Sequence, residues 1–253
     1  PIDQNIERCG CRRRSLVGHY FRNHRTAHFH SQNYRPFMKL KISPVSKMLL
    51  LSITFSMSLL LVRYRFAPTE DYSFYPWNIF LAAIPYVMST QLLKLKKINF
   101  LAILMLVIWL LFFPNAPYII TDIFHYEQRL PIPFWYDLIL VISAAWNGLI
   151  LGMISLMNVE KFLLRHLKPT WVTICEFLSL LLCSYGIFIG RFLRFNSWNV
   201  LTDPRSLVYS SANHLLAPQN YQKLWVFTIL FAVMLGLIYF TLKKLPKMME
   251  GKP

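Results

Sequence analysis

The chain has 253 residues, of which 55% are hydrophobic and only 15% are charged, and its formal net charge is +16 at pH 7. Soluble domains carry about 25% charged residues, so this composition excludes an ordinary soluble globular protein. A basic chain suits nucleic acid, but here the basic residues are spread along short segments and the mean hydropathy is +0.40. We therefore expect an integral membrane protein with the lipid bilayer as its main partner and no nucleic-acid partner.

The segment before Met38 differs from the rest of the chain. It is rich in arginine and histidine, has no apolar periodicity, and supplies +5 of the net charge. Met38 is followed by lysines and an apolar run, which is typical of the start of a membrane protein. We expect residues 1–37 to be a disordered tail or translated non-coding sequence, and residues 38–253 to form a single membrane domain.

Six apolar stretches occupy the membrane domain. A helix rises about 1.5 Å per residue and the hydrocarbon core is about 30 Å thick, so about 20 residues cross it. Five stretches hold 19 or 20 residues and the third holds 16. The sequence therefore predicts an all-α integral membrane protein with six transmembrane helices. These spans are 44–62, 75–93, 98–113, 138–157, 171–189 and 224–242.

Lysine and arginine are distributed unequally between the two faces that these spans define. One face holds thirteen of them in segments 38–253 and the other holds seven, and Lys223 is the single lysine on the poorer face. Cytoplasmic segments retain lysine and arginine, whereas translocated segments are depleted of both. The distribution predicts that both termini are cytoplasmic.

The third span ends in a proline-rich motif. Pro114 and Pro117 cannot continue a regular helix, so we expect the third helix to be broken there or to form a re-entrant turn. If the following segment is helical, Asp122 and His125 share a face, where they would bind a metal or relay a proton. In the alternative reading, Asp122 caps a short interfacial helix and His125 lies in water beside it. Two candidate ligands do not define a metal site, so none is predicted.

A second polar cluster follows the fifth span, on the same predicted outer side. Arg191 and Arg194 are three residues apart and can direct two guanidinium groups at one anion. Asn196, Trp198 and Asp203 follow them and supply further polar and aromatic groups. The alternative is that these residues only anchor the helix at the membrane interface. Arginine is uncommon at the translocated end of a span, and its presence here favours a binding site.

Two polar residues belong to the fourth span, Asp137 at its outer entrance and Asn147 inside it. Asp137 begins the span at the outer side, where a carboxylate requires a partner, and topology makes Arg191 or Arg194 the expected one. This pair would either lock two spans together or form part of a ligand site. Asn147 lies deeper, where an amide more often joins helices than lines a transport pathway.

Small residues recur four apart in the fourth and fifth spans, in Gly148–Gly152 and Gly186–Gly190. This spacing lets helix backbones approach closely. We expect these two spans to pack tightly against neighbouring helices, and one possible arrangement is that they pack on each other.

Three motifs, at residues 113–125, 135–137 and 190–201, together resemble the bacterial family of predicted membrane proteins catalogued as domain of unknown function 1361. The resemblance covers roughly Met48 to Leu242. It implies a multi-span helical fold in a bacterial inner membrane, and it implies no activity, cofactor or catalytic residues.

The chain has no phosphate-binding glycine loop and no Gly-x-Ser-x-Gly elbow. The leading hypothesis is a non-enzymatic protein that binds or transports a small anionic or lipid-headgroup ligand at the extracytoplasmic face. One alternative is a membrane enzyme acting on lipid or envelope precursors, and another is a structural or accessory protein without a ligand. The sequence identifies neither a catalytic residue nor a cofactor. The residues expected to shape a ligand site are Asp122, His125, Asp137, Arg191, Arg194, Asn196, Trp198 and Asp203.

Overall fold

A computed structural model of the protein describes residues 43–67, 72–127, 131–195 and 202–249. Every regular element within these ranges is a helix, so the predicted all-α fold class is confirmed. The expectation for residues 1–37 concerns residues outside the described ranges. The elements are α1 (Pro44–Phe66), α2 (Tyr75–Leu92), α3 (Phe100–Phe112), α4 (Asn115–Tyr118), η1 (Ile119–His125), α5 (Phe134–Leu163), α6 (Pro169–Phe192), α8 (Pro204–Leu216), η2 (Pro218–Tyr221) and α9 (Gln222–Met249).

Local sequence signals explain where several helices begin. Ser43 caps α1 by accepting a hydrogen bond from the backbone N–H of Ser46, and Asn99 caps α3 in the same way. Proline occupies the first turn of α1, α6 and α8, where its missing N–H has no intrahelical partner to lose.

Five helical stretches among the described residues are long and apolar enough to cross a membrane, and they agree with five of the six predicted spans. The second predicted span is helical, as α2, but does not reach this combination of length and hydropathy. It carries Asn78 and Gln91 among its 18 residues, and these lower its hydropathy. That α2 crosses the membrane stays a prediction. The five stretches are Pro44–Phe66, Phe100–Phe124, Phe134–Leu163, Pro169–Phe192 and Pro218–Leu245.

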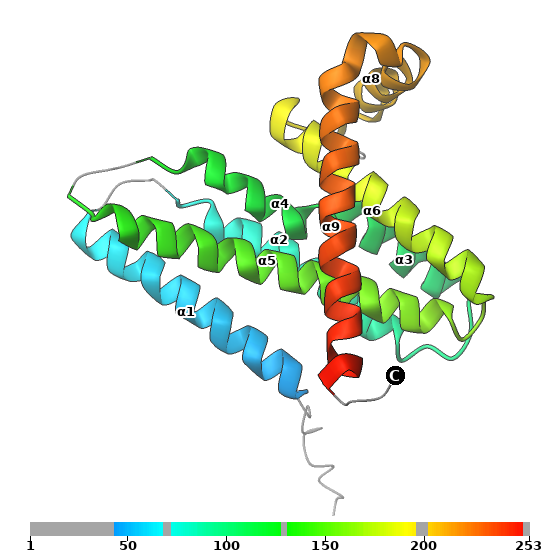
Figure 1. Ribbon diagram of the computed structural model, residues 1–253, viewed down its shortest axis with the longest axis horizontal. Helices are drawn as coiled ribbons and strands as arrows, with labels where there is room; N and C mark the ends of the chain where they lie inside the picture. Colours follow the sequence, from blue (N-terminus) through cyan, green and yellow to red (C-terminus); the bar gives the residue numbers. More distant parts are fainter. Residues whose placement is uncertain (1–42, 68–71, 128–130, 196–201, 250–253) are drawn as a thin grey trace, which may run out of the picture. The chain divides into compact units, whose positions relative to one another are not determined.

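The third span is interrupted at its prolines, as predicted. Helix α3 ends at Phe112, the short α4 follows, and the chain then tightens into the 3₁₀ helix η1. The chain remains helical across the interruption, so the re-entrant turn is not formed. Both α4 and η1 pack on α5, and α4 also packs on α2 (Figure 1).

The helical glycines of α5 and α6 contact this interrupted segment rather than each other. A Cβ atom at Gly148 would lie 2.3 Å from the carbonyl oxygen of Ala116, and one at Gly186 would lie 2.8 Å from Cγ of Pro114. Spans four and five therefore do pack tightly through these glycines, but against the interrupted third span; the arrangement in which the glycines face each other is not the one formed. At Gly148 and Gly186 a side chain would collide with the interrupted segment, so glycine is what allows α5 and α6 to approach it this closely.

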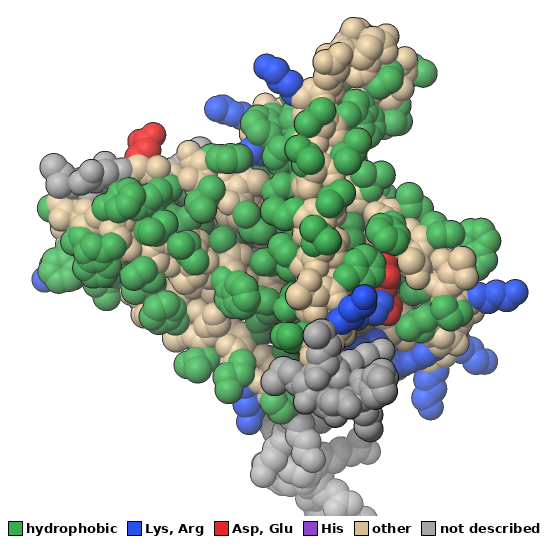
Figure 2. All heavy atoms as spheres, viewed as in Figure 1, with side chains coloured by type: hydrophobic (Ala, Val, Ile, Leu, Met, Phe, Trp, Pro, Cys, Tyr) green, Lys and Arg blue, Asp and Glu red, His purple; other side chains and the backbone are tan. Residues whose placement is uncertain are grey.

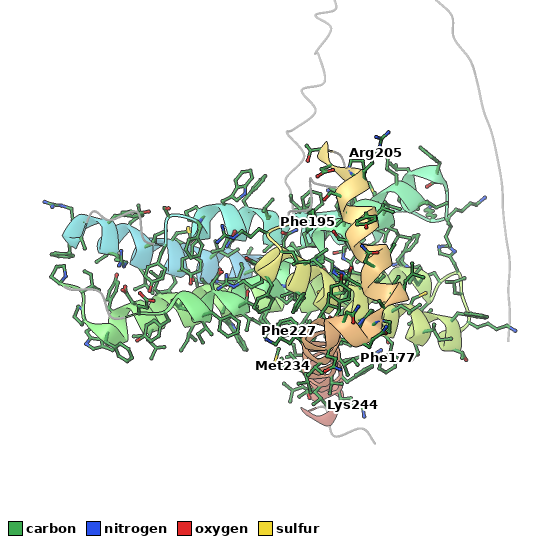
Figure 3. The ribbon with its side chains drawn as sticks, turned by 90° about the horizontal axis from the view of Figure 1, so that it is seen from above. Phe177, Phe195, Arg205, Phe227, Met234 and Lys244 are labelled. Atoms are coloured by element: carbon green, nitrogen blue, oxygen red, sulfur yellow. The ribbon has the colours of Figure 1, made fainter. Side chains whose placement is uncertain are left out.

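The remaining helices complete the packing. Helix α1 lies beside α5 and α2 lies against α5, whereas α9 packs along α6 (Figure 1). In Figure 3, Phe177 of α6 lies beside α9, and its ring is 5.6 Å from that of Phe240. Hydrophobic side chains cover much of the face seen in Figure 2, including exposed leucines of α1 and α9. Such a surface suits a membrane-embedded protein.

Candidate functional site

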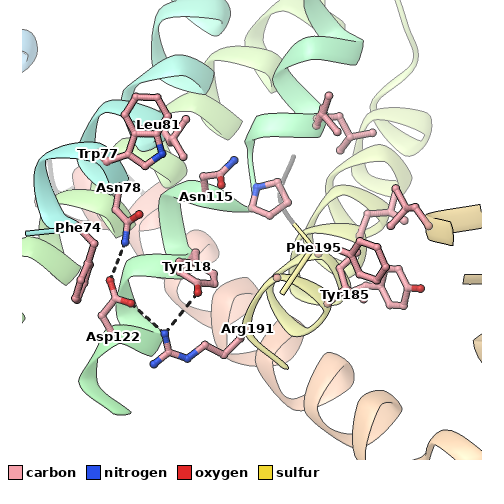
Figure 4. A pocket seen from close by; sticks show the side chains of 18 of the residues that line it. Phe74, Trp77, Asn78, Leu81, Asn115, Tyr118, Asp122, Tyr185, Arg191 and Phe195 are labelled. Atoms are coloured by element: carbon pink, nitrogen blue, oxygen red, sulfur yellow. Dashed lines mark hydrogen bonds and ion pairs between the residues drawn. The ribbon is translucent and has the colours of Figure 1, made fainter. Parts of the chain in front are cut away.

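A cavity of about 580 Å³ lies between α2, α3, α4 and α6 (Figure 4). Most of its lining is apolar; Asn78, Asp122 and Arg191 lie together at one end, which we call the polar end, whereas Tyr185 lies on the opposite side. This volume lies within the range of ordinary small-molecule sites. The polar lining residues are Asn78, Asn115, Tyr118, Asp122, Tyr185 and Arg191.

Asp122 is placed at the polar end by η1 and is 1% exposed. Its Oδ1 accepts a hydrogen bond from Nη1 of Arg191 at 3.2 Å, and its Oδ2 accepts one from Nδ2 of Asn78 at 3.2 Å. Both carboxylate oxygens are thus engaged by donors from two other helices, as the dashed lines in Figure 4 show. These two hydrogen bonds hold the carboxyl group of Asp122 in one orientation.

Arg191 reaches the same point from the last turn of α6. Besides the bond to Asp122, its Nη2 donates to the carbonyl oxygen of Thr121 at 2.7 Å, and Nη1 lies 3.5 Å from the hydroxyl oxygen of Tyr118. Its guanidinium carbon also lies 5.6 Å from the ring centre of Phe124. The guanidinium is therefore oriented by charge, backbone and aromatic contacts together.

Further polar groups border the cavity on α4 and α6. Asn115 donates to the carbonyl oxygen of Phe112, which satisfies part of the helix end left open by the prolines. The hydroxyl of Tyr185 donates to Ser211 and lies 2.9 Å from Nδ1 of His214. Burial lowers the pKa of His214, which lies in α8.

The apolar lining is partly open to the surroundings of the helices. Trp77 of α2, Val107 of α3 and Leu182 of α6 line the cavity, yet their exposed fractions are 53%, 58% and 49%. In a membrane-embedded protein these three side chains would face hydrocarbon. The cavity therefore combines an apolar side with a polar end that carries one positive and one negative charge.

Asp137 is paired with Arg63 of α1 and not with Arg191 or Arg194 as predicted. Nε of Arg63 donates to its Oδ1 at 2.8 Å, and the two side chains are 1% and 2% exposed. The prediction of a partner for Asp137 was right, but its identity was wrong. Arginine near the end of α1 was counted only as a topology signal, and its depth depends on how α1 packs against α5.

The guanidinium groups of Arg191 and Arg194 are not directed at one common point in this structure. Arg191 is engaged with Asp122, whereas Arg194 is exposed and has φ of 59° just beyond the end of α6. Asp203 caps α8 by accepting from the backbone N–H of Ser206. The side chain of His125 lies outside the described part of the chain.

Asn196 and Trp198 lie outside the described residues as well. Within the described ranges, no group of three His, Cys, Asp or Glu side chains is placed to hold a metal ion. Asn147, predicted to join helices, donates to the carbonyl oxygen of Ser52 and to the hydroxyl of Ser56, so it does form hydrogen bonds between α5 and α1.

Asn78 was not identified from the sequence. It lies in the first turn of α2 among aromatic residues, and the signal available was an amide within an otherwise apolar run. Its role depends on α2 lying next to η1, which no local pattern indicates.

Comparison with known proteins adds the family. The family model described as "Protein of unknown function (DUF1361)" matches residues 77–238. The chain belongs to this family. No curated protein and no solved structure matches it.

The DUF1361 region includes the polar end of the cavity but not all of the buried charges. Asn78, Asp122 and Arg191 lie within the matched residues, whereas Arg63 and all of α1 precede them. The Asp122–Arg191 site is thus built entirely from the DUF1361 region. The Asp137–Arg63 pair joins this region to α1.

Proposed function

We propose that the protein is a multi-pass membrane protein that binds a small amphipathic ligand with an anionic or lipid-type headgroup. The observation that carries this proposal is the cavity of about 580 Å³, with apolar walls and Arg191 at its polar end. Apolar walls suit a hydrocarbon chain, and a guanidinium suits a phosphate or carboxylate, which it can bind through two parallel hydrogen bonds.

The proposal places the headgroup at the extracytoplasmic face of a bacterial inner membrane, with both termini in the cytoplasm. The lysine and arginine distribution supports this orientation. Under it, Asp122 and Arg191 lie at the outer ends of their spans. The exposed lining residues Trp77, Val107 and Leu182 would let a lipid reach the cavity from the bilayer.

Asp122 and Arg191 neutralise each other in the structure, so an anionic headgroup would compete with Asp122 for the guanidinium. A guanidinium has five N–H donors, and it can therefore accommodate an additional acceptor. Asn78 would keep Asp122 in position during this exchange, because its amide binds the other carboxylate oxygen. The engagement of both Asp122 oxygens favours binding over a catalytic base.

The test is native mass spectrometry of full-length protein with two probes, dioctanoyl phosphatidic acid and inorganic phosphate. Leu182→Trp adds bulk to the cavity wall on α6 and leaves Asp122 and Arg191 unchanged, whereas Leu178, one turn away and similarly exposed, does not line the cavity, so Leu178→Trp is the control. We expect the lipid to bind the wild type and Leu178→Trp and to be lost from Leu182→Trp. Equal lipid binding to both variants would refute the proposal. Binding of phosphate without binding of the lipid would show that the site takes a free anion and not a lipid.

A further inference from the structure

Helix α8 exposes its apolar side chains and directs polar ones inward, which is the reverse of a helix on the surface of a soluble protein. Val208, Tyr209, Leu215 and Leu216 are 66%, 72%, 66% and 82% exposed. Residues 208 and 215 are seven apart, as are residues 209 and 216, so the four side chains lie along one side of the helix. We call these four residues the apolar stripe of α8.

The opposite, polar side of α8 attaches the helix to the rest of the protein. The hydroxyl of Tyr185 in α6 donates to the hydroxyl of Ser211 at 3.0 Å and lies 2.9 Å from Nδ1 of His214. The indole N–H of Trp225 in α9 donates to the carbonyl oxygen of His214, and the rings of His214 and Tyr221 are 4.5 Å apart. These contacts determine which side of α8 is directed at α6 and α9, and they leave the apolar stripe outside.

The contact with α6 places α8 beside the last turns of that helix and not beyond its end. Tyr185 is seven residues before Phe192, the last residue of α6, which corresponds to about 10 Å along the helix. Leu207 of α8 lines the cavity together with Leu182 and Gly186, which lie at the same level of α6. Because α6 is long and apolar enough to cross a membrane, this level is within the depth of a lipid leaflet.

Helix α8 also runs across the direction of its neighbouring span. In Figure 3, α9 is seen nearly end on, and its Phe227, Met234 and Lys244 lie close together, whereas α8 extends across the view from Arg205. In Figure 1, α9 is seen lengthwise and α8 lies at its upper end. A helix that lies across the end of a span runs along the membrane surface, so one of its sides faces lipid.

The residue types on the exposed side of α8 suit lipid better than water. Arg205 is the one Asp, Glu, Lys or Arg residue of α8, and it precedes Tyr209 by four positions, so it lies at the end of the apolar stripe. An arginine there can lay its aliphatic stem on apolar surface and reach the headgroup phosphates. Tyrosine is enriched at the level of the headgroups. A helix side exposed to water would carry charges along its length.

We propose that α8 is an interfacial helix whose apolar stripe is embedded in the lipid leaflet around the adjoining ends of α6 and α9. Acyl chains cover the stripe, and Arg205 lies among the headgroup phosphates. The polar side is satisfied by Tyr185 and Trp225, so it does not require water. The inference rests on α6 and α9 crossing the membrane, as proposed above, and not on a ligand in the cavity.

Photo-cross-linking of the full chain tests this proposal in nanodiscs of dioleoyl phosphatidylcholine and dioleoyl phosphatidylglycerol. The photoreactive residue p-benzoylphenylalanine is placed singly at Val208 or Leu215, at the exposed Leu230 of α9 as the positive control, or at the exposed loop residue Lys96 as the negative control. Mass spectrometry should find lipid adducts at positions 208, 215 and 230 and none at position 96. Adducts at position 230 alone, or cross-links from α8 to a second copy of the chain, would overturn the proposal. Absence of adducts at position 230 as well would also refute the membrane-spanning assignment of α9.

A charge placed on the apolar stripe provides a second test in the same nanodiscs. Leu216→Glu puts a carboxylate where the proposal places acyl chains, so α8 should leave the leaflet and its amides should lose protection from hydrogen exchange. Gln219→Glu, at an exposed position just beyond α8, is the control and should leave this protection unchanged. Unchanged protection in Leu216→Glu would overturn the proposal, because a side chain exposed to water tolerates a charge.

Discussion

Replacing Gly148 with alanine would place a Cβ atom 2.3 Å from the carbonyl oxygen of Ala116 and 2.9 Å from Cδ1 of Ile119. Real Cβ atoms essentially never approach another atom within 3.0 Å, and the oxygen belongs to the backbone of α4 and cannot rotate away. Helices α4 and α5 would have to separate by roughly 1 Å, which also weakens the surrounding van der Waals contacts. The expected cost is about 3 kcal/mol, at the upper end of overpacking effects.

Alanine also has a higher helix propensity than glycine, by about 1 kcal/mol, so the net loss of unfolding free energy should be about 2 kcal/mol. Gly236→Ala is the matched control, because its Cβ would meet only Cδ1 of Leu180 at 3.9 Å, an ordinary contact. We expect this control to be neutral or slightly stabilising. Equilibrium unfolding of both variants in detergent measures the difference. If Gly148→Ala proved as stable as Gly236→Ala, the close approach of α5 to the interrupted third span would be refuted.

Three further predictions concern charged and titratable side chains. Asp137→Ala should lower the unfolding free energy by about 3–5 kcal/mol, because it leaves Arg63 buried without its counter-ion. Replacing both residues with apolar ones should recover most of the loss. An unchanged melting profile for Asp137→Ala would contradict a buried pair. Asp122→Asn should bind dioctanoyl phosphatidic acid about tenfold more tightly in native mass spectrometry, because the competing carboxylate is gone. This gain corresponds to about 1.4 kcal/mol of binding free energy. Weaker binding would show that Asp122 assists headgroup binding instead. Burial lowers the pKa of His214, so the unfolded state binds the proton more readily; the stabilisation is present above the ordinary histidine pKa of about 6.5 and is lost as the pH falls toward the lowered value. The protection factors of the α8 amides, which correct for the slower intrinsic exchange at lower pH, should fall over that window, and His214→Gln should remove this pH dependence.

Much of the site was accessible from the sequence because polar residues in apolar surroundings are conspicuous. Asp122 and Arg191 were both singled out as candidates, and the structure brings them together at 3.2 Å. Asp137 was expected to need a counter-ion, and it has one. In each case the cost of burying a charge indicated that a partner exists, but this cost is the same for any arginine and cannot select one.

The choice of partner required the packing of helices that are distant in sequence. Arg63 is separated from Asp137 by the whole of α2 and α3, and it reaches the carboxylate because α1 lies along α5. Glu160 of α5, Glu176 of α6 and Lys243 of α9 show the same limit, since three separate helices contribute to one network of ion pairs. Spacing rules connect residues within one helix, and they contain no information on which helices are neighbours.

What the sequence by itself determined is therefore local: apolar stretches long enough for a bilayer, helix starts at Ser43 and Asn99, and an interruption at Pro114 and Pro117. These follow from hydropathy, capping and the missing proline N–H, which act over a few residues. Only the tertiary structure decided that the α5 and α6 glycines accommodate this interruption, which ion pairs form, and that a cavity opens at Arg191. Those outcomes depend on distances between backbones, which are set by the packing of all the helices together.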